Sequence, residues 1–250
     1  MKFVEKPNLP QKRVKSLIIG DKYSDFLDKS LKNVGITPIY VPNNGFVDKR
    51  LSGHADLSVL HLGDNRLICA KHLRGSELAD KLAKYHASVT YAETEQNSRY
   101  PYDANLNVCI IGNWIILNPR TADKLIDANL TNAVIKVGQG YARCSVCVVD
   151  EDSIITADPG IASAAETCGF HVLRIKPNIA SLPGFQYGFI GGAAFKISRG
   201  ELAFTGRIND ENEKERIENF LCSRGVKPVY LTDEPLSDIG GAVPMLEAEV

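Results

Sequence analysis

The sequence has no excess of charge of either sign and no long hydrophobic run. Its 29 basic and 30 acidic side chains leave a net charge of −1 over 250 residues, which argues against a broad surface that neutralises the phosphates of nucleic acids or anionic membranes. No stretch approaches the roughly 18 to 20 consecutive apolar residues of a membrane-spanning helix, and the opening MKFVEKPNLPQKRVK lacks the apolar core of a signal peptide. We therefore expect a cytoplasmic protein that does not bind membranes, and binding to nucleic acid is not expected.

Cysteine is also scarce, with six residues scattered along the chain. In a cytoplasmic protein we expect these thiols to be reduced. Cys144 and Cys147 form a Cys-x-x-Cys pair, but no second pair completes the four ligands of a structural zinc site. We expect no disulfide, no metal and no cofactor. The other cysteines lie in apolar contexts and are expected to pack against neighbouring elements: Cys69, Cys109, Cys168 and Cys222.

What the sequence does contain is a unit that recurs five times. In each unit a helical stretch is followed by a short run of β-branched or aromatic residues that ends near proline, glycine or an acidic residue. These runs are Thr37–Pro42, Ser88–Glu93, Ala133–Gly138, His171–Pro177 and Lys227–Asp233. After a loop, each run leads to a strand rich in small and apolar residues. These second strands begin at Asp56, Asn105, Arg143, Gly191 and Gly240.

In four of the units a tight turn and another strand come next. The turns contain glycine, asparagine or aspartate, which tolerate the positive φ of two-residue hairpins. The unit that begins at Gly240 lacks this partner, whereas the segment Arg13–Gly20 is a strand without a unit. We therefore expect these two segments to pair and to close a ring, so that first and last segments share one blade.

Helical periodicity fills the space between each hairpin and its closing strand. Ser76, Thr121 and either Asn209 or Asp210 are predicted N-caps, and Gly225 is predicted to end its helix. The helical segments are 21–35, 76–86, 121–130, 161–168 and 211–225.

Strand, turn, strand, helix and strand, repeated five times, predict an α/β fold. Specifically, we predict a five-bladed α/β propeller with pseudo-fivefold repeats in a single domain over residues 1–250. A Rossmann sheet is not expected, because no glycine-rich phosphate turn opens a helix after the first strand. An ordinary mixed α/β domain, whose strands resemble one another by chance, is the alternative.

Two short motifs carry the chemistry. Gly53–Leu57 reads Gly-His-Ala-Asp-Leu, and in an extended segment His54 and Asp56 would project to the same face, roughly 7 Å apart. The second motif, Gly138–Ser145, is a glycine-rich lead-in to Cys144. The two motifs lie 90 residues apart (144 minus 54), which two units of this length would span.

This plan and these motifs resemble the pentein fold of the guanidino-group-modifying superfamily. That superfamily includes arginine deiminases, dimethylarginine dimethylaminohydrolases and amidinotransferases, and also a ribosome-binding translation initiation factor without catalysis. The resemblance implies that Cys144 attacks an amidine or guanidinium carbon, that His54 moves protons to and from the leaving amine, and that Asp56 holds the cationic substrate. Arg143, where some members have histidine, is also predicted to bind the substrate. The thiolate needs a nearby cation, and Arg143, His54 or a bound guanidinium could supply it.

The chain departs from the superfamily at its Gly-Gly motifs. Where the enzymes carry Glu-Gly-Gly-Asp or a close variant, this chain has Ile190–Ala193 and Ile239–Ala242, which contain no carboxylate. Asp238 and Asp103 stand near equivalent positions and are predicted to contact the substrate. The chain also starts at a different blade, so that the catalytic candidates fall in the first and third hairpins.

The loop Tyr100–Asn107 adds further polar candidates. Asp103, Asn105 and Asn107 alternate at the entry to a strand, so we predict that they line one face and bind a polar ligand. A turn-rich strand entry without a ligand is the alternative. Cys144 poses a difficulty, because aligning its strand with the first hairpin strand places it level with Leu57, on the face opposite Asp56. Only a one-residue shift brings it to the Asp56 side.

Taken together, the sequence predicts a cysteine-dependent hydrolase or transferase that acts on a guanidino, amidino or related C–N compound. Its partner would be a small, polar, cationic molecule. The alternative is a non-catalytic pentein that binds a protein, RNA or ribosomal partner, which the missing Gly-Gly carboxylates favour.

Overall fold

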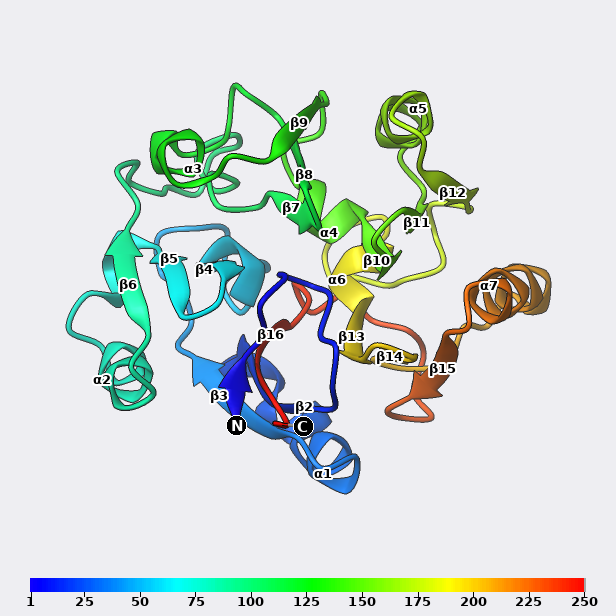
Figure 1. Cartoon of the computed structure of the whole chain (residues 1–250), viewed down its shortest axis with the longest axis horizontal. Helices are drawn as coiled ribbons and strands as arrows, with labels where there is room; N and C mark the ends of the chain where they lie inside the picture. The colour runs from blue at the N-terminus through cyan, green and yellow to red at the C-terminus, as the bar shows by residue number, and fades with distance from the viewer. Residues whose placement is uncertain (250) are drawn as a thin grey trace.

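The computed structural model describes residues 1–249, which form five small sheets. Figure 1 shows the sheets arranged around a common centre, with the longer helices on the outside. Within this described part, no helix is long and apolar enough to cross a membrane.

Four of the sheets repeat one arrangement. Two antiparallel strands form a hairpin, and a helix then leads to a third strand that pairs in parallel with the second. The four units are β4 (Val59–Gly63), β5 (Arg66–Cys69), α2 (Glu77–Lys84) and β6 (Ser88–Tyr91); β7 (Cys109–Ile111), β8 (Trp114–Leu117), α3 (Lys124–Asn129) and β9 (Ala133–Lys136); β10 (Cys147–Asp150), β11 (Ser153–Thr156), α5 (Pro159–Thr167) and β12 (His171–Arg174); and β13 (Ala194–Ser198), β14 (Glu201–Phe204), α7 (Glu211–Ser223) and β15 (Lys227–Tyr230). The predicted hairpins are confirmed.

The fifth sheet joins the two ends of the chain. Its strand order is β1 (Lys2–Phe3), β16 (Val243–Glu247), β2 (Val14–Gly20) and β3 (Thr37–Val41), with α1 (Ser24–Asn33) between β2 and β3. β16 is antiparallel to β2, with Val243 opposite Ile18. The predicted pairing of N-terminal and C-terminal strands is therefore present. β1, which pairs with β16, was not predicted because two residues show no periodicity.

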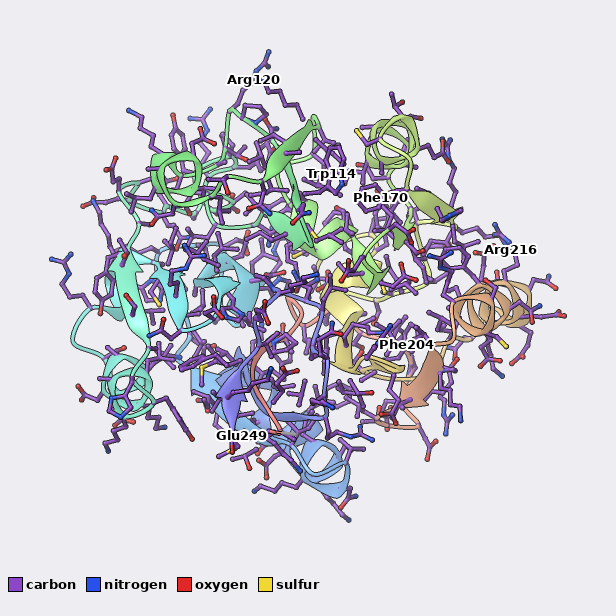
Figure 2. All side chains as sticks on the ribbon, in the orientation of Figure 1. Trp114, Arg120, Phe170, Phe204, Arg216 and Glu249 are labelled. Atoms are coloured by element: carbon purple, nitrogen blue, oxygen red, sulfur yellow. The ribbon has the colours of Figure 1, made fainter. Side chains whose placement is uncertain are left out.

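The core lies between neighbouring sheets rather than in one central layer. Along β2, Leu17 and Ile19 pack with α1 and with Phe195 of the preceding sheet, whereas Ile18 packs with Val59 of the following sheet. Successive side chains of a strand point to opposite faces, so β2 is apolar on both sides. Figure 2 shows side chains filling these spaces. Between two units, the rings of Trp114 and Phe170 meet edge to face, with their centroids 6.1 Å apart.

Most predicted helix ends agree with the structure. Ser76 caps α2 by accepting a hydrogen bond from the Ala79 N–H, and Asp210 caps α7. The prediction for Thr121 is wrong, because Asp123 caps α3 while the Thr121 hydroxyl donates to the Asn118 carbonyl. The prediction for Cys222 is also wrong: it lies on the outer side of α7 and is exposed.

Three of the predicted strands begin with a short helical turn instead. These turns are η2 (Ala55–Leu57), α4 (Ala142–Ser145) and α6 (Ile190–Ala193). They lie at the inner ends of the hairpins, where the units crowd together. A Cβ on Gly191 would overlap the carbonyl groups of Arg143 and Val146, so α4 and α6 approach as closely as they do only because glycine stands there.

The N-terminal segment crosses the centre of the molecule, as the dark blue trace in Figure 1 shows. Asn8 donates a side-chain hydrogen bond to the Ile110 carbonyl, and the Val4 N–H donates to Met245. Pro7 and Asn8 line a small central cavity of about 20 Å³ together with Asp56 and Arg143, among others. The N-terminal segment therefore covers Asp56 from one side.

Candidate active site

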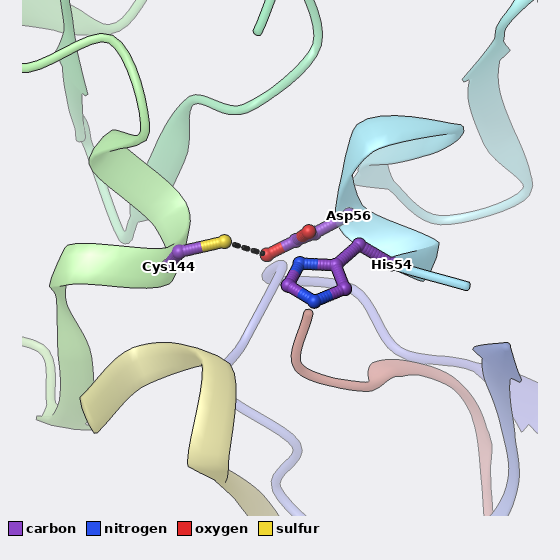
Figure 3. A group of neighbouring side chains, drawn as sticks. All are labelled: His54, Asp56 and Cys144. Carbon is purple, nitrogen blue, oxygen red and sulfur yellow. Dashed lines mark hydrogen bonds between the residues drawn. The ribbon is translucent and has the colours of Figure 1, made fainter. Parts of the chain in front are cut away.

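Three side chains that the sequence singled out meet near the centre. Nitrogen, oxygen and sulfur atoms of His54, Asp56 and Cys144 lie within 4.8 Å of one another, and all three residues are buried. Figure 3 shows Cys144 approaching from one unit and His54 with Asp56 from another. The thiol of Cys144 donates a hydrogen bond of 2.9 Å to Oδ2 of Asp56.

Asn107 fixes the position of Cys144. The backbone N–H of Cys144 donates to Oδ1 of Asn107 at 3.1 Å, and Nδ2 of Asn107 donates to Sγ at 3.2 Å. Cys144 lies in the helical turn α4 rather than in a strand. The strand alternation that seemed to turn it away from Asp56 therefore does not apply.

The turn η2 holds the other two side chains. His54 precedes the turn with extended backbone angles, and Asp56 lies inside it, so the prediction that both project from one extended segment is wrong. The backbone N–H of Asp56 donates to the Gly240 carbonyl at 3.3 Å. Gly240 has φ of +71°, and a Cβ there would overlap the His54 side chain. The backbone of the Gly-Gly segment therefore packs directly against the His54 side chain.

The electrostatics of the group favour a protonated thiol. Burial raises the pKa of Asp56 to about 6, against the opposing influence of His54, Arg143 and the thiol hydrogen bond. Burial and the negative charges of Asp56 and Asp238 raise the pKa of Cys144 well above its usual value. A cation placed beside these carboxylates would act in the opposite direction and favour the thiolate.

Asp238 supplies a carboxylate immediately before the Gly-Gly pair. It is buried, and it accepts hydrogen bonds from the N–H groups of Phe189 at 2.8 Å and Gly240 at 2.9 Å. It borders the same cavity as His54 and Cys144. A carboxyl group is therefore present at the site although both Gly-Gly motifs lack one.

The loop residues separate instead of sharing one face. Asn107 contacts Cys144, as described above. Asp103 accepts a hydrogen bond of 2.7 Å from the Tyr141 hydroxyl, and its Oδ1 has no hydrogen-bond partner within residues 1–249. Asn105 points away from Cys144, and its Oδ1 accepts a hydrogen bond of 2.8 Å from Nε2 of Gln96. The predicted alternation is wrong, because the backbone turns here, with Asn107 N–H bonded to the Ala104 carbonyl.

Arg143 lies behind the site and does not line the cavity. Its buried guanidinium donates to the carbonyls of Gly191 at 3.0 Å and Ala242 at 3.4 Å. It thereby connects α4 to α6 and to the residue before β16. Its charge lowers the pKa of Asp56, so it influences the site through electrostatics rather than through contact with a ligand.

A cavity of about 270 Å³ gives access to the sulfur. Besides His54, Cys144 and Asp238, its lining is mostly apolar and aromatic: Leu51, Tyr141, Leu182, Phe185, Gln186, Tyr187 and Phe189. The sequence-based reasoning missed this wall. The signal was the segment Gly184–Phe189, GFQYGF, which places three aromatic residues within six positions of a chain with 8% aromatics.

The imidazole, carboxylate and thiol are also ligand types that Zn²⁺ accepts. Their spacing within 4.8 Å would allow a common ion, which would displace the thiol proton. Measurements of thiol reactivity on this protein should therefore include a chelator.

The fold is shared with enzymes that modify guanidino groups. An inosamine-phosphate amidinotransferase from Streptomyces griseus has a TM-score of 0.61 at 9% identity, covering 99% of this chain and 98% of that one. An amidinotransferase of saxitoxin biosynthesis from Microseira wollei gives 0.59 at 10% identity, with the same coverage. Dimethylarginine dimethylaminohydrolase from Pseudomonas aeruginosa, as a cysteine-to-serine mutant with citrulline, gives 0.56 at 10% identity, covering 94% and 100%. These likenesses define a pentein fold.

Within this fold, the chain belongs to a family of unknown function, DUF6873, whose match covers residues 18–243. A comparison with curated proteins found no match.

Proposed function

We propose that this chain is a cysteine-dependent hydrolase or transferase that acts on a guanidino, amidino or related C–N compound. The observation that carries the proposal is the convergence of Cys144, His54 and Asp56 beside a cavity that also contains Asp238. We further propose that residues 1–250 act as one pentein-like domain whose five sheets form a closed propeller. The fold shared with amidinotransferases and a dimethylarginine dimethylaminohydrolase supports this reading.

The proposed reaction begins when the cationic group enters the cavity beside Asp238 and His54, in front of the buried Asp56. Its charge offsets the two carboxylates, so the Cys144 proton can move to His54. The thiolate then adds to the central carbon. His54 returns the proton to the leaving nitrogen, the C–N bond breaks, and a thioester-like amidino intermediate remains on the sulfur.

The second half of the reaction uses His54 as a base. It takes a proton from water in a hydrolase, or from an acceptor amine in a transferase, and the resulting nucleophile adds to the same carbon. The C–S bond then breaks and Cys144 leaves as a thiolate. Asn107 would stabilise that thiolate, because its Nδ2 already donates to Sγ at 3.2 Å.

One observation favours the non-catalytic alternative. The neighbouring carboxylate favours the protonated Cys144 thiol, and Nε2 of His54 is buried without a hydrogen-bond partner among the residues that the structure describes. A protein that only binds a ligand would keep this resting arrangement when the ligand is present. The two proposals therefore differ in whether a cation activates the thiol.

Alkylation separates them. With a chelator present, 2-chloroacetamidine should label Cys144 at least 10-fold faster than the uncharged 2-chloroacetamide does, after both rates are normalised to the exposed Cys222. Mass mapping assigns the labelled thiol. His54→Ala should slow the labelling of Cys144 and leave Cys222 unchanged. Labelling of Cys144 no faster than that of the other thiols would refute the activated nucleophile.

A further inference from the structure

The outer part of the cavity is an aromatic wall. The rings of Tyr141 and Phe189 lie 6.3 Å apart, and those of Phe189 and Tyr187 lie 6.3 Å apart in an edge arrangement. The Tyr141 hydroxyl is engaged by Asp103 at 2.7 Å, which leaves the ring rather than the hydroxyl to face a ligand. Phe185 and Tyr187 are 39% and 37% exposed, so their apolar surface is accessible from solvent.

Buried leucines extend the wall inward. Leu51 and Leu182 line the cavity and belong to one apolar cluster, against which Tyr141 packs. A ligand group in contact with these residues would leave water for an apolar surface, which is favourable roughly in proportion to the area covered. Asp238 and His54 lie in the same cavity. The cavity therefore combines a site for a cation with a site for an apolar group.

The part of the chain that the structure describes places no lysine or arginine in the cavity to pair with a carboxylate arm. Arg50 lies close by, with its guanidinium 4.1 Å from the centroid of the Phe185 ring, but it is already paired. It donates to both carboxylate oxygens of Asp48, at 2.9 and 2.6 Å, and to the Gly184 carbonyl at 2.7 Å. An anionic arm would be desolvated without a cationic partner and repelled by Asp238.

We propose that the substrate carries its amidino or guanidino group on an uncharged aromatic or apolar arm, and not on an amino-acid chain that ends in a carboxylate. This inference rests on the proposed function for the position of the cationic group. At about 270 Å³ the cavity is slightly smaller than those that enclose drug-sized ligands. A head group with one ring matches that size.

Calorimetric titration with three guanidines tests the arm directly. The probes are methylguanidine, which has the head group alone, benzylguanidine, which adds a ring, and arginine. Wild type and Cys144→Ala should both bind benzylguanidine at least 10-fold more tightly than either other probe. Phe185→Ser and Tyr187→Ser should each reduce this preference and leave methylguanidine binding unchanged. Phe46→Ser is the matched control, because Phe46 is 60% exposed and borders a different cavity.

The outcomes distinguish this inference from the proposed function. Equal binding of the three guanidines, tighter binding of arginine, or no binding of any of them would overturn the inference. Selective labelling of Cys144 by chloroacetamidine would leave the proposed reaction standing in each of those cases. Conversely, tight benzylguanidine binding without labelling of Cys144 would retain the ligand class and remove the catalytic step.

Discussion

Replacing Asp56 by asparagine should affect neutral and cationic electrophiles in opposite ways. Asparagine keeps the shape of the side chain but removes the charge that faces Sγ of Cys144 at 2.9 Å. Without that charge the thiolate forms more readily, so alkylation by neutral iodoacetamide should become faster. The same change removes an attraction for cations, so alkylation by 2-chloroacetamidine should become slower.

The size of the first effect follows from the geometry. Two negative charges 2.9 Å apart repel by roughly 6 kcal/mol at an effective dielectric constant of about 20. If at least one pKa unit of this repulsion, about 1.4 kcal/mol, remains beside the opposing charges of His54 and Arg143, the thiolate fraction changes at least about tenfold. A thiolate of lower pKa is also a weaker nucleophile, by roughly half of that gain on a logarithmic scale. The observed rate should therefore rise at least about threefold at pH 7.

The assay is the time course of alkylation at pH 7 with a chelator, followed by mass mapping of each cysteine. Cys222 is the internal control, because it is exposed and belongs to α7, outside the set of residues that line the cavity. Asp238→Asn should shift both rates in the same directions, since its charge also raises the pKa of Cys144. The electrostatic reasoning is refuted if Asp56→Asn leaves the iodoacetamide rate of Cys144 unchanged or lowers it.

Two further experiments test how the site is held. Burial raises the pKa of Asp56 from 3.8 to about 6, so the contribution of the protonated side chain to stability is full below about pH 4 and is lost as the pH rises through 6. In chemical denaturation, Asp56→Asn should therefore stabilise the protein by about 3 kcal/mol at pH 8 and have little effect at pH 4. Equal effects at both pH values would contradict this. Gly240→Ala, whose Cβ would overlap His54, should lower stability and abolish amidine labelling of Cys144. Gly225→Ala is the control, because Gly225 has φ of +66° and open space around it; this change should cost about 1 kcal/mol of stability and retain the labelling. Equal labelling of the two glycine variants would show that Gly240 does not position His54.

The repeating part of the fold could be predicted from the sequence because its signals are local. Each hairpin has small or polar turn residues between two apolar strands, and each closing strand follows a helix with its own cap, as at Ser76 and Asp210. The pairing of β2 with β16 was also accessible, because each segment lacked a partner. These inferences needed only periodicity and the requirement that strands be paired.

The inner ends of the hairpins could not be predicted in the same way. Asp56 and Cys144 lie in helical turns that arise where the units crowd together at the centre. Strand alternation therefore gave the wrong geometry for Cys144. It also gave the wrong geometry for Asn105, whose side chain bonds to Gln96 instead of facing the site. The identity of the site residues came from a motif resemblance, whereas their approach depends on contacts between distant units that periodicity does not encode.

Under the proposed function, ligand charge and thiol chemistry are coupled. Asp56, Asp238 and Cys144 bring two carboxylates and a protonated thiol together, and burial makes their negative charge costly. The nearby Arg143 offsets part of it through space, but its hydrogen bonds go to backbone carbonyls. A bound amidinium would supply the missing counter-charge and lower the thiol pKa in the same event. The thiol would thus remain protonated until a ligand of the right charge arrives, which limits its reaction with neutral electrophiles.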